Sequence, residues 1–373
     1  MKKQYPFAEK FRDQILRCSS CGFCRAVCPV FGLTKRSALN ARGKMLILKE
    51  VMDGNIDLND ELVETLFQCT TCASCANQCP SGVNPPEIIK QVRKDMVHQG
   101  TCHPAFEGMN RVLQEHTNIY GEDEPEDFER ERNKKANVVY FIGCVGSYRE
   151  DEATRAALDL LDHLKVDYTL IDEVCCSGAL EDVGFQIHQD LVQRNVDMIL
   201  ATGAKTVITG CPYCSRTFNN RVEYQALKDK GVETIHISQF LKNFDFEVTT
   251  DKIVTYHDPC DLGRHCGIYE EPRETIRKIA PHFVEMRHNR ANALCCGAGG
   301  GVRGAFAKNS IDMARIRLKE AEEIGAEIVL TECNSCVHNL KNAKLRAQKF
   351  KIFTVTQFLN HLLDEAEQAS DQE

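Results

Sequence analysis

The sequence contains the stretch Cys18-Ser-Ser-Cys-Gly-Phe-Cys-Arg-Ala-Val-Cys-Pro29, and its cysteine spacing recurs in Cys69-Thr-Thr-Cys-Ala-Ser-Cys-Ala-Asn-Gln-Cys-Pro80. These eight cysteines belong to a total of 20 in a chain of 373 residues. The N-terminus lacks the apolar core of an export signal, and the cytosol keeps thiols reduced, so we do not expect a disulfide framework. Clustered cysteines in a reducing compartment indicate metal ligands or redox groups.

The spacing C-x2-C-x2-C-x3-C-P is that of the loop that binds an iron–sulfur cluster in bacterial ferredoxins. Three closely spaced thiolates converge on one cluster, and the fourth, which precedes proline, ligates the other cluster. The sequence therefore predicts two cubane [4Fe–4S] clusters: cluster 1 on Cys18, Cys21, Cys24 and Cys79, and cluster 2 on Cys69, Cys72, Cys75 and Cys28. Zinc is the structural alternative, because it also accepts four cysteines, but the paired loops favour iron–sulfur and a role in electron transfer.

Charge and hydropathy exclude several other classes of protein. The chain carries 46 Lys and Arg against 54 Asp and Glu, a formal net charge of −8, whereas a nucleic-acid binder would be basic. Hydrophobic residues make up 43%, which is enough for ordinary packed cores. No uncharged apolar run approaches the ~18 residues of a membrane helix. We therefore expect a cytoplasmic protein that has no transmembrane segment of its own and reaches a membrane only through a partner.

The second half contains an internal duplication. Gly203–Cys214 aligns with Gly325–Cys336 at an offset of 122, with six of twelve positions identical. Each copy alternates short β-rich runs with helical patterns, which is typical of α/β units with parallel sheet. The predicted strands include residues 138–142, 206–209, 253–256 and 327–330. In the N-terminal third we expect short helices between the cysteine loops, among them 41–52, 61–67 and 86–98.

The predicted fold class is therefore α+β overall, with a helical N-terminal ferredoxin-type domain that holds two [4Fe–4S] clusters and two duplicated α/β domains after it. Residues 117–136 are rich in charge and poor in apolar side chains, which indicates a solvated linker. The expected boundaries are 1–116 for the ferredoxin-like domain, 117–136 for the charged linker, 137–250 and 251–363 for the duplicated domains, and 364–373 for an acidic tail.

Ten further cysteines form two sets with the shared pattern of one cysteine, a Cys-Cys pair and a Cys-x-x-Cys pair. This pattern resembles the cysteine-rich "CCG" domain pair in the catalytic subunits of heterodisulfide reductase. The same pair is found in the iron–sulfur subunits of glycolate, lactate and glycerol-3-phosphate dehydrogenases. His257–Arg264 and Cys295–Arg303 look most similar to the methanogen-type subunit that fuses a two-cluster ferredoxin domain to two CCG domains. The resemblance extends from about Cys18 to Leu359.

The resemblance implies two noncubane [4Fe–4S] clusters, each held by five cysteines. The residues at the matching positions are Cys144, Cys175, Cys176, Cys211 and Cys214 for cluster 3, and Cys260, Cys295, Cys296, Cys333 and Cys336 for cluster 4. The first set departs from the family by reading Cys-Cys-Ser177-Gly178 where Cys-Cys-Gly is expected, which leaves the local backbone geometry open. Cys266 and Cys102 lie outside the sets, and we interpret them as structural; an accessory or redox role for Cys266 stays open.

Several residues near the second set are candidates for contact with a substrate. These are His257, Arg264, His265 and Arg303. Arginine suits anion recognition and histidine suits proton delivery, but support of a cluster is an equally good interpretation.

Arg42 and Lys44 are expected to offset cluster charge. Residues Gly299–Gly304 match G-x-G-x-x-G without a βαβ context, so we expect the glycines to allow close backbone approach, and no nucleotide, flavin or haem.

The resemblance implies one of two functions. In the first, the chain is a heterodisulfide reductase-like iron–sulfur enzyme that passes electrons from clusters 1 and 2 to clusters 3 and 4 and reduces a disulfide. The family substrate is the mixed disulfide of coenzyme M and coenzyme B. In the second, the chain is an electron-transfer subunit between a flavoprotein dehydrogenase and a quinone or membrane cytochrome. Either function requires a redox partner, such as a flavoprotein, a hydrogenase or dehydrogenase module, or a membrane cytochrome b.

Overall fold

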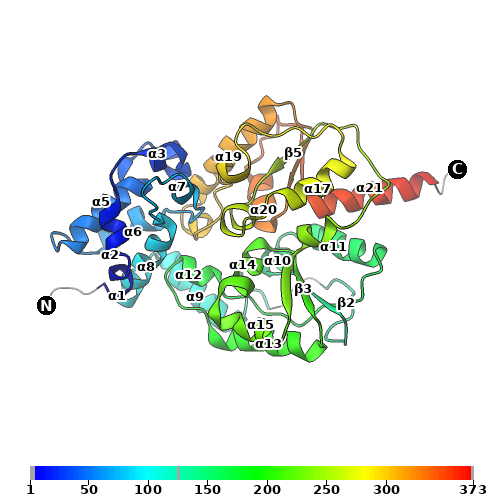
Figure 1. Ribbon diagram of the computed structural model, residues 1–373, viewed down its shortest axis with the longest axis horizontal. Coiled ribbons are helices and arrows are strands. Elements are labelled where there is room, and N and C mark those ends of the chain that lie inside the picture. The colour runs from blue at the N-terminus through cyan, green and yellow to red at the C-terminus, as the bar shows by residue number, and fades with distance from the viewer. Residues whose placement is uncertain (1–4, 124–126, 371–373) are drawn as a thin grey trace. The chain divides into compact units, whose positions relative to one another are not determined.

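The computed structural model describes residues 5–123 and 127–370, which divide into two compact units (Figure 1). Unit 1 comprises Met1–Arg111, Gly178–Ile187 and Ala291–Arg317. Unit 2 comprises Val112–Ser177, His188–Arg290 and Leu318–Glu373. In the described residues, no helix is both long and apolar enough to cross a membrane.

Unit 1 is helical around its cysteine loops, as the sequence predicts. Its N-terminal helices are α1 (Pro6–Glu9), α2 (Arg12–Arg17), α3 (Phe23–Val27), α4 (Pro29–Thr34), α5 (Ala41–Met52), α6 (Asp60–Phe67), α7 (Ser74–Asn77), α8 (Pro85–His98) and α9 (Pro104–His116). Capping fixes where the long helices begin: the Asn40 side chain accepts the Gly43 N–H at 2.9 Å, and two prolines open α8. Buried residues such as Met45, Leu66 and Ile89 form the core between the helices.

Unit 2 contains two parallel sheets, which correspond to the two repeats. The first has the order β2-β1-β3-β4 and the second the order β5-β6-β7. Their bounds are β1 (Val138–Phe141), β2 (Tyr168–Thr169), β3 (Thr206–Thr209), β4 (Glu233–His236), β5 (Val254–His257), β6 (Ile328–Thr331) and β7 (Lys351–Thr354). The predicted fold class is thus confirmed: a helical ferredoxin-type domain precedes two α/β repeats with parallel sheets.

Sequence patterning found the four strands that carry the cysteine loops and missed β2, β4 and β7. All three missed strands lie at the edges of their sheets. In β4 and β7 the first residue is exposed and the third is half-buried, while β2 has only two residues. Strands β4 and β7 bury two of their four side chains, so their apolar signal is weak, and β2 is too short to form a pattern. The remaining edge strand, β5, is buried throughout and was found.

The two repeats share one hydrophobic core. Helix α11 (Asp151–His163) of the first repeat packs against α21 (Val355–Ser370) of the second, and Figure 1 shows them side by side. Leu158 and Leu161 of α11 belong to the same buried cluster as Phe358 of α21. Because α21 continues to Ser370, most of the expected acidic tail is helical, and residues 371–373 lie outside the described residues.

The expectation of a fully solvated linker at 117–136 is wrong for its second half. Phe128 is 2% exposed and belongs to the core of unit 2. The Asn133 N–H donates to the Leu170 carbonyl at 2.8 Å, next to an isolated bridge between Arg132 and Leu170. One buried aromatic side chain and these backbone hydrogen bonds hold a segment that its charged composition marked as exposed. Residues 124–126 lie outside the described residues.

A buried arginine fixes the loop between β5 and Cys260. Arg273, on α17 (Glu270–Ile279), is 0% exposed. Its Nη1 and Nη2 donate to the Asp258 carboxylate at 2.6 and 2.8 Å, and its Nε donates to Glu285 at 2.7 Å. The two-pronged contact anchors Asp258, two residues before Cys260, to a helix.

Replacing Arg273 by Met should lower the free energy of unfolding by ~3–5 kcal/mol, because Asp258 would stay buried without its cationic partner. Arg277→Met on the same helix is the control, since Arg277 is exposed and its pair with Glu270 contributes under ~1 kcal/mol. Anoxic guanidinium unfolding followed by circular dichroism measures both. Equal losses in the two variants would contradict the role assigned to Arg273.

Candidate iron–sulfur sites

Two cavities in unit 1 are lined by the cysteines of the N-terminal loops. The cysteines of cavity A are Cys18, Cys21, Cys24 and Cys79, and those of cavity B are Cys28, Cys69, Cys72 and Cys75. Each cavity therefore takes three thiols from one loop and the fourth from the other loop. This grouping is the one that the crossed-ligand assignment requires, although the binding of clusters by these residues stays a prediction.

The two loops also share their backbone conformation. Ser20 and Thr71, which precede the second cysteine of each loop, have φ of 57° and 52°. Gly22 and Ala73, which follow that cysteine, have φ of 91° and 60°. A left-handed backbone costs free energy for residues other than glycine, and three of these four residues are not glycine. The two loops therefore share a strained curvature that local sequence preferences do not explain. Cavities that each present four cysteine thiols on loops of this curvature fit an iron–sulfur cluster.

Buried charge surrounds cavity B. Burial raises the pKa of the Cys28 thiol to about 11, against the effect of nearby Lys44, and burial also raises that of Cys75. Lys44 is 1% exposed, lines the cavity and donates to the Leu39 carbonyl at 2.6 Å. Its own pKa is lowered by burial, while the Cys69 and Cys28 thiolates act in the opposite direction. A buried ammonium beside four thiols is the counter-charge that a thiolate-ligated cluster needs.

The five cysteines of the first repeat meet within unit 2. Cys214 Sγ lies 3.5 Å from Cys176 Sγ and also interacts with Cys211, while Cys175 interacts with both Cys144 and Cys176. Contact with Cys144, together with burial, raises the pKa of Cys175, and contact with Cys176 does the same for Cys214. Cys144 follows β1 and Cys211 follows β3. The two cysteines meet because the carboxyl ends of these neighbouring parallel strands lie at one edge of the sheet.

The serine that replaces glycine in the first repeat keeps the backbone geometry. Ser177 has φ of 62° and Gly297, its counterpart, has φ of 90°. The Ser177 N–H donates to Cys175 Sγ at 3.4 Å, and the Gly297 N–H donates to Cys295 Sγ at 3.3 Å. A Cβ on Gly297 would lie 2.5 Å from the Ser310 carbonyl oxygen, so the second repeat requires glycine.

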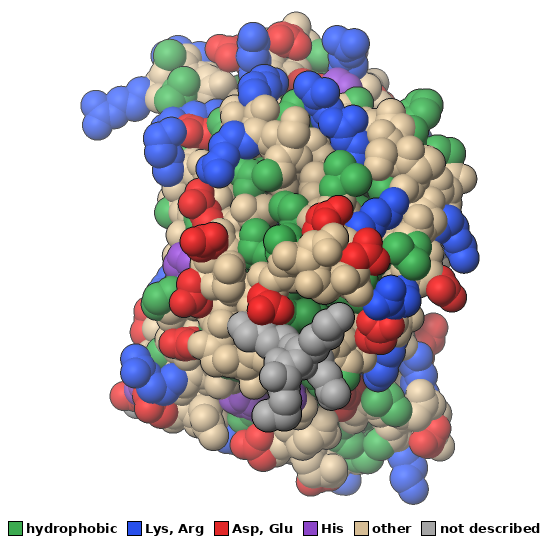
Figure 2. Space-filling view, turned by 90° about the vertical axis from the view of Figure 1, so that its left-hand side faces the viewer, with side chains coloured by type: hydrophobic (Ala, Val, Ile, Leu, Met, Phe, Trp, Pro, Cys, Tyr) green, Lys and Arg blue, Asp and Glu red, His purple; other side chains and the backbone are tan. Residues whose placement is uncertain are grey.

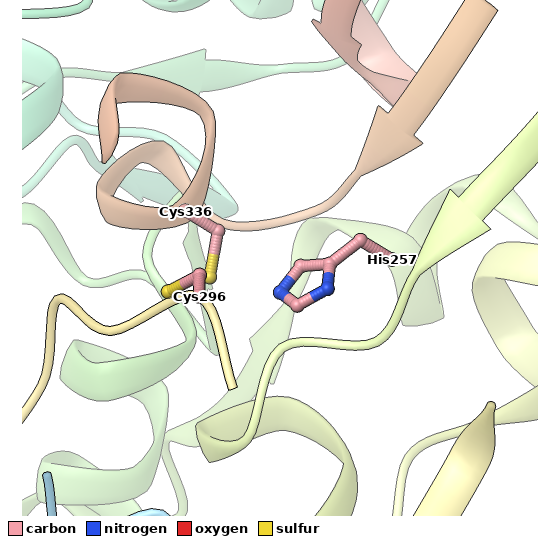
Figure 3. A group of neighbouring side chains, drawn as sticks. All are labelled: His257, Cys296 and Cys336. Atoms are coloured by element: carbon pink, nitrogen blue, oxygen red, sulfur yellow. The ribbon is translucent and has the colours of Figure 1, made fainter. Parts of the chain in front are cut away.

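The second repeat brings His257 next to one of its cysteines. His257 is the last residue of β5 and is 1% exposed. One of its ring nitrogens lies within 4.8 Å of Cys336 Sγ on α20 (Asn334–Ala343), and Figure 3 shows the ring pointing toward this cysteine. Cys333 caps α20, and Cys260 precedes the turn η3 (Asp261–His265). Cys296, the third side chain in Figure 3, belongs to unit 1, as does Cys295.

The other candidate substrate residues lie on two different elements. Arg264 and His265 are half-buried on η3 of unit 2, whereas Arg303 is half-buried on α18 (Val302–Ala305) of unit 1. The two extra cysteines, Cys102 and Cys266, are half-buried, and burial raises their pKa values to about 12 and about 11. Neither cysteine is among the residues that line cavity A or cavity B.

Sequence analysis missed Glu173, which shapes the site of the first repeat. Its carboxylate accepts the N–H groups of Ile142 at 2.8 Å and Gly143 at 2.6 Å, directly before Cys144. Burial raises the pKa of Glu173 to about 8, although both N–H contacts act to lower it. The one sequence signal for Glu173 was its position two residues before Cys175. A single acidic residue in a loop is more often solvated, so this position did not identify it as a buried hydrogen-bond acceptor.

Comparison with known proteins agrees with this architecture. The 4Fe-4S dicluster domain model matches residues 14–83, and the cysteine-rich domain model matches residues 138–219 and 254–341. One relative is a subunit of the dihydromethanophenazine:CoB–CoM heterodisulfide reductase of Methanosarcina acetivorans. It is 31% identical over 364 residues, which cover 88% of each chain. This chain belongs to the same family of heterodisulfide reductase subunits.

Two further matches show how widely the architecture is used. The EtfAB:quinone oxidoreductase of Syntrophomonas wolfei is 23% identical over 92% of this chain and 57% of its own. A solved structure of a hypothetical protein from Helicobacter pylori has a TM-score of 0.59 at 12% identity, covers 96% of this chain and 76% of its own, and shares the fold alone. Membership of the heterodisulfide reductase family, with its dicluster and cysteine-rich domains, makes the chain an iron–sulfur oxidoreductase subunit.

The crossed ligand sets can be tested by pairs of substitutions. Cys79→Ala should lose ~4 iron atoms per chain, and adding Cys21→Ala should remove no more, because both residues serve cluster 1. Adding Cys72→Ala to Cys79→Ala should raise the loss to ~8 iron atoms, because two clusters are then affected. Iron analysis of anoxically purified protein gives the counts, with Cys102→Ala as the control that keeps its iron. Identical iron contents in the two double variants would contradict the crossed assignment.

Proposed function

We propose that the chain takes electrons through clusters 1 and 2 to clusters 3 and 4 and there reduces a disulfide, in the first place the mixed disulfide of coenzyme M and coenzyme B. The observation that carries this proposal is the convergence of all five thiols of the first repeat, together with a second set that is also complete. The Methanosarcina acetivorans relative, named a CoB–CoM heterodisulfide reductase subunit, supports this choice of substrate.

The reaction needs electrons, protons and a binding site for an anionic substrate, and residues of the chain suit each need. Cleaving one disulfide into two thiols consumes two electrons and two protons. The iron–sulfur clusters would supply the electrons one at a time. The guanidinium groups of Arg264 and Arg303 suit the anionic groups of such a substrate, and His257 and His265 suit proton delivery.

A second candidate function is an electron relay without disulfide chemistry. The Syntrophomonas wolfei relative is named for electron transfer from EtfAB to a quinone, and its match covers 92% of this chain. In that function the chain would connect a flavoprotein partner to a quinone or membrane cytochrome, and substrate thiols would have no site on it.

The two functions are separated by anoxic electron paramagnetic resonance of the oxidised chain, titrated with coenzyme M and coenzyme B. A new signal that depends on a thiol is expected if substrate sulfur reaches a C-terminal cluster. Well-formed clusters whose spectra ignore both thiols would overturn the disulfide reductase and favour the relay.

Single ligand substitutions give a second test of the proposal. Cys333→Ala or Cys296→Ala should abolish disulfide reduction with an artificial electron donor, because each removes a ligand of cluster 4. The N-terminal clusters should stay reducible, since their ligands are unchanged. Cys102→Ala, outside all four sets, should keep its turnover and serves as the control. Retained turnover in both ligand variants would contradict the proposal.

We also propose where an electron-donating partner docks. Residues 11–50 contain eight Lys and Arg but two Asp and Glu, although the whole chain has a net charge of −8. We define the Cys21 face as Leu16, Arg17, Cys21, Phe23 and Arg25, all of which are exposed. Figure 2 shows blue basic and green apolar side chains, with some red acidic ones, in the upper part of its view.

The Cys21 face combines the two features of a transient electron-transfer interface. Phe23 is 61% exposed and Leu16 is 45% exposed, so the face offers an apolar centre beside a cysteine of cavity A. Arg17 follows Leu16 and Arg25 lies two residues after Phe23, and both are exposed, so they add positive charge that selects an acidic surface and accelerates encounter. The occupant that fits is an acidic protein that carries a one-electron redox centre.

Charge reversal tests the docking face. The double variant Arg17→Glu, Arg25→Glu should slow reduction by an acidic ferredoxin at least ~10-fold at low salt, with the difference shrinking as salt screens the charges. Lys230→Glu with Lys349→Glu, two exposed lysines of unit 2, makes the same change in net charge and should have little effect. Photoreduction by a deazaflavin should be equal in all variants. Equal ferredoxin rates in both double variants would overturn the assignment.

A further inference from the structure

Arg93 joins three segments of unit 1 that lie far apart in the sequence. It lies on α8 and is 0% exposed. Its Nη2 donates to the carbonyl oxygens of Leu66 at 3.0 Å and Cys69 at 2.8 Å, and its Nε also reaches Leu66 at 3.2 Å. Its Nη1 donates to the carbonyl oxygens of Gly300 at 3.1 Å and Asp182. One side chain therefore ties the second cysteine loop to segments that follow the cysteine pairs of both repeats.

The acceptors of this guanidinium are all neutral backbone oxygens. The Asp182 carboxylate accepts the Thr71 hydroxyl at 2.8 Å, and its charge acts on Arg93 without being among the hydrogen-bond acceptors named above. A fully buried guanidinium costs several kcal/mol unless negative charge lies near it. The negative groups that act on Arg93 against the effect of burial are the Cys69 thiolate, which has the largest effect, the Asp182 carboxylate and the Cys102 thiolate. A cluster held at Cys69 would add negative charge on the side of the guanidinium that donates to the Cys69 carbonyl oxygen.

The segments held by Arg93 lie so close together that a side chain at either of two glycines would clash with the cysteine loop. Gly300 has φ of 61°, and a Cβ on it would lie 2.3 Å from the Cys69 carbonyl oxygen. A Cβ on Gly299 would lie 2.8 Å from the Thr70 carbonyl oxygen. In the same region, Cys295 Sγ lies 3.7 Å from Thr70 Oγ1. The glycines after the second cysteine pair thus allow contact between the ligand loop of cavity B and the Cys295 segment.

We propose that Arg93 is a positioning residue with two effects: it supplies the positive counter-charge of cluster 2, and it holds the Cys69–Thr70 backbone against the Cys295–Gly300 segment for electron passage between the two ligand sets. The inference rests on the ligand sets proposed above. Each passage moves one electron from the reduced donor to the oxidised acceptor and requires no proton. A positive charge near a cluster stabilises its reduced form, so Arg93 raises the reduction potential of cluster 2.

Two substitutions separate the two effects. Arg93→Gln removes the charge and should lower the midpoint potential of cluster 2, leaving that of cluster 1 unchanged. Arg93→Lys keeps the charge but cannot make the forked contacts, so it should retain most of the potential and still slow electron passage. Potentials come from redox titrations of the full chain followed by electron paramagnetic resonance, and rates come from freeze-quenched samples after flash photoreduction.

Lys90 provides a matched control on the same helix. It is 3% exposed and pairs with Glu87 at 2.6 Å, so it is a second buried cation of α8 that already has a carboxylate partner. Lys90→Gln should lower stability but leave the potential of cluster 2 where it is. Gly300→Ala keeps Arg93 and strains the close contact, so it should slow electron passage at an unchanged potential.

The outcomes distinguish this inference from the proposed function. If wild-type protein holds no cluster at Cys28, Cys69, Cys72 and Cys75, the ligand assignment itself fails. If the cluster is present and Arg93→Gln shifts its potential no more than Lys90→Gln does, the counter-charge role is overturned. If Arg93→Lys and Gly300→Ala both pass electrons at the wild-type rate, the positioning role is overturned.

Discussion

Thiol groups from segments far apart in the sequence have to meet in small buried groups, and the rest of the structure depends on that convergence. In unit 2 it is achieved by parallel strands, whose carboxyl ends lie at one edge of each sheet. The loop after β1 supplies Cys144, and the loop after β3 supplies Cys211. In unit 1, where the described residues form helices, left-handed turns at four matching positions curve the two loops around cavities A and B.

Burial of so many thiols has an electrostatic consequence that explains the unusual cations of the core. Burial raises the pKa of thiols such as Cys28 and Cys75, so their thiolates need compensating charge. Unit 1 places the fully buried Lys44 beside Cys28 and Cys69, and the fully buried Arg93 beside Cys69, and both cations donate hydrogen bonds to backbone carbonyl oxygens. The arrangement is costly for a metal-free protein and becomes favourable once negative clusters are bound.

Some of the residues that hold the loops can be identified from the sequence, and others cannot. Cysteine spacing indicated the ligand candidates, and β-branched runs such as Thr206–Thr209 indicated the central strands. Strands β4 and β7 were missed because only two of the four side chains in each are buried, and Phe128 lies in a segment of charged composition. Arg93 and Glu173 carry no motif, because their importance lies in the backbone groups that surround them.

The sequence by itself determined the kind of protein this is: two crossed cysteine loops, a duplicated cysteine-rich domain and a chain without a long apolar helix in its described part. Spacing suffices for this, since thiolate ligands close together in a loop have few other uses. Only the tertiary structure decided that Ser177 keeps the turn made by Gly297 and that Arg93 ties three segments together. These features depend on contacts across as many as 207 residues, which local patterns do not encode.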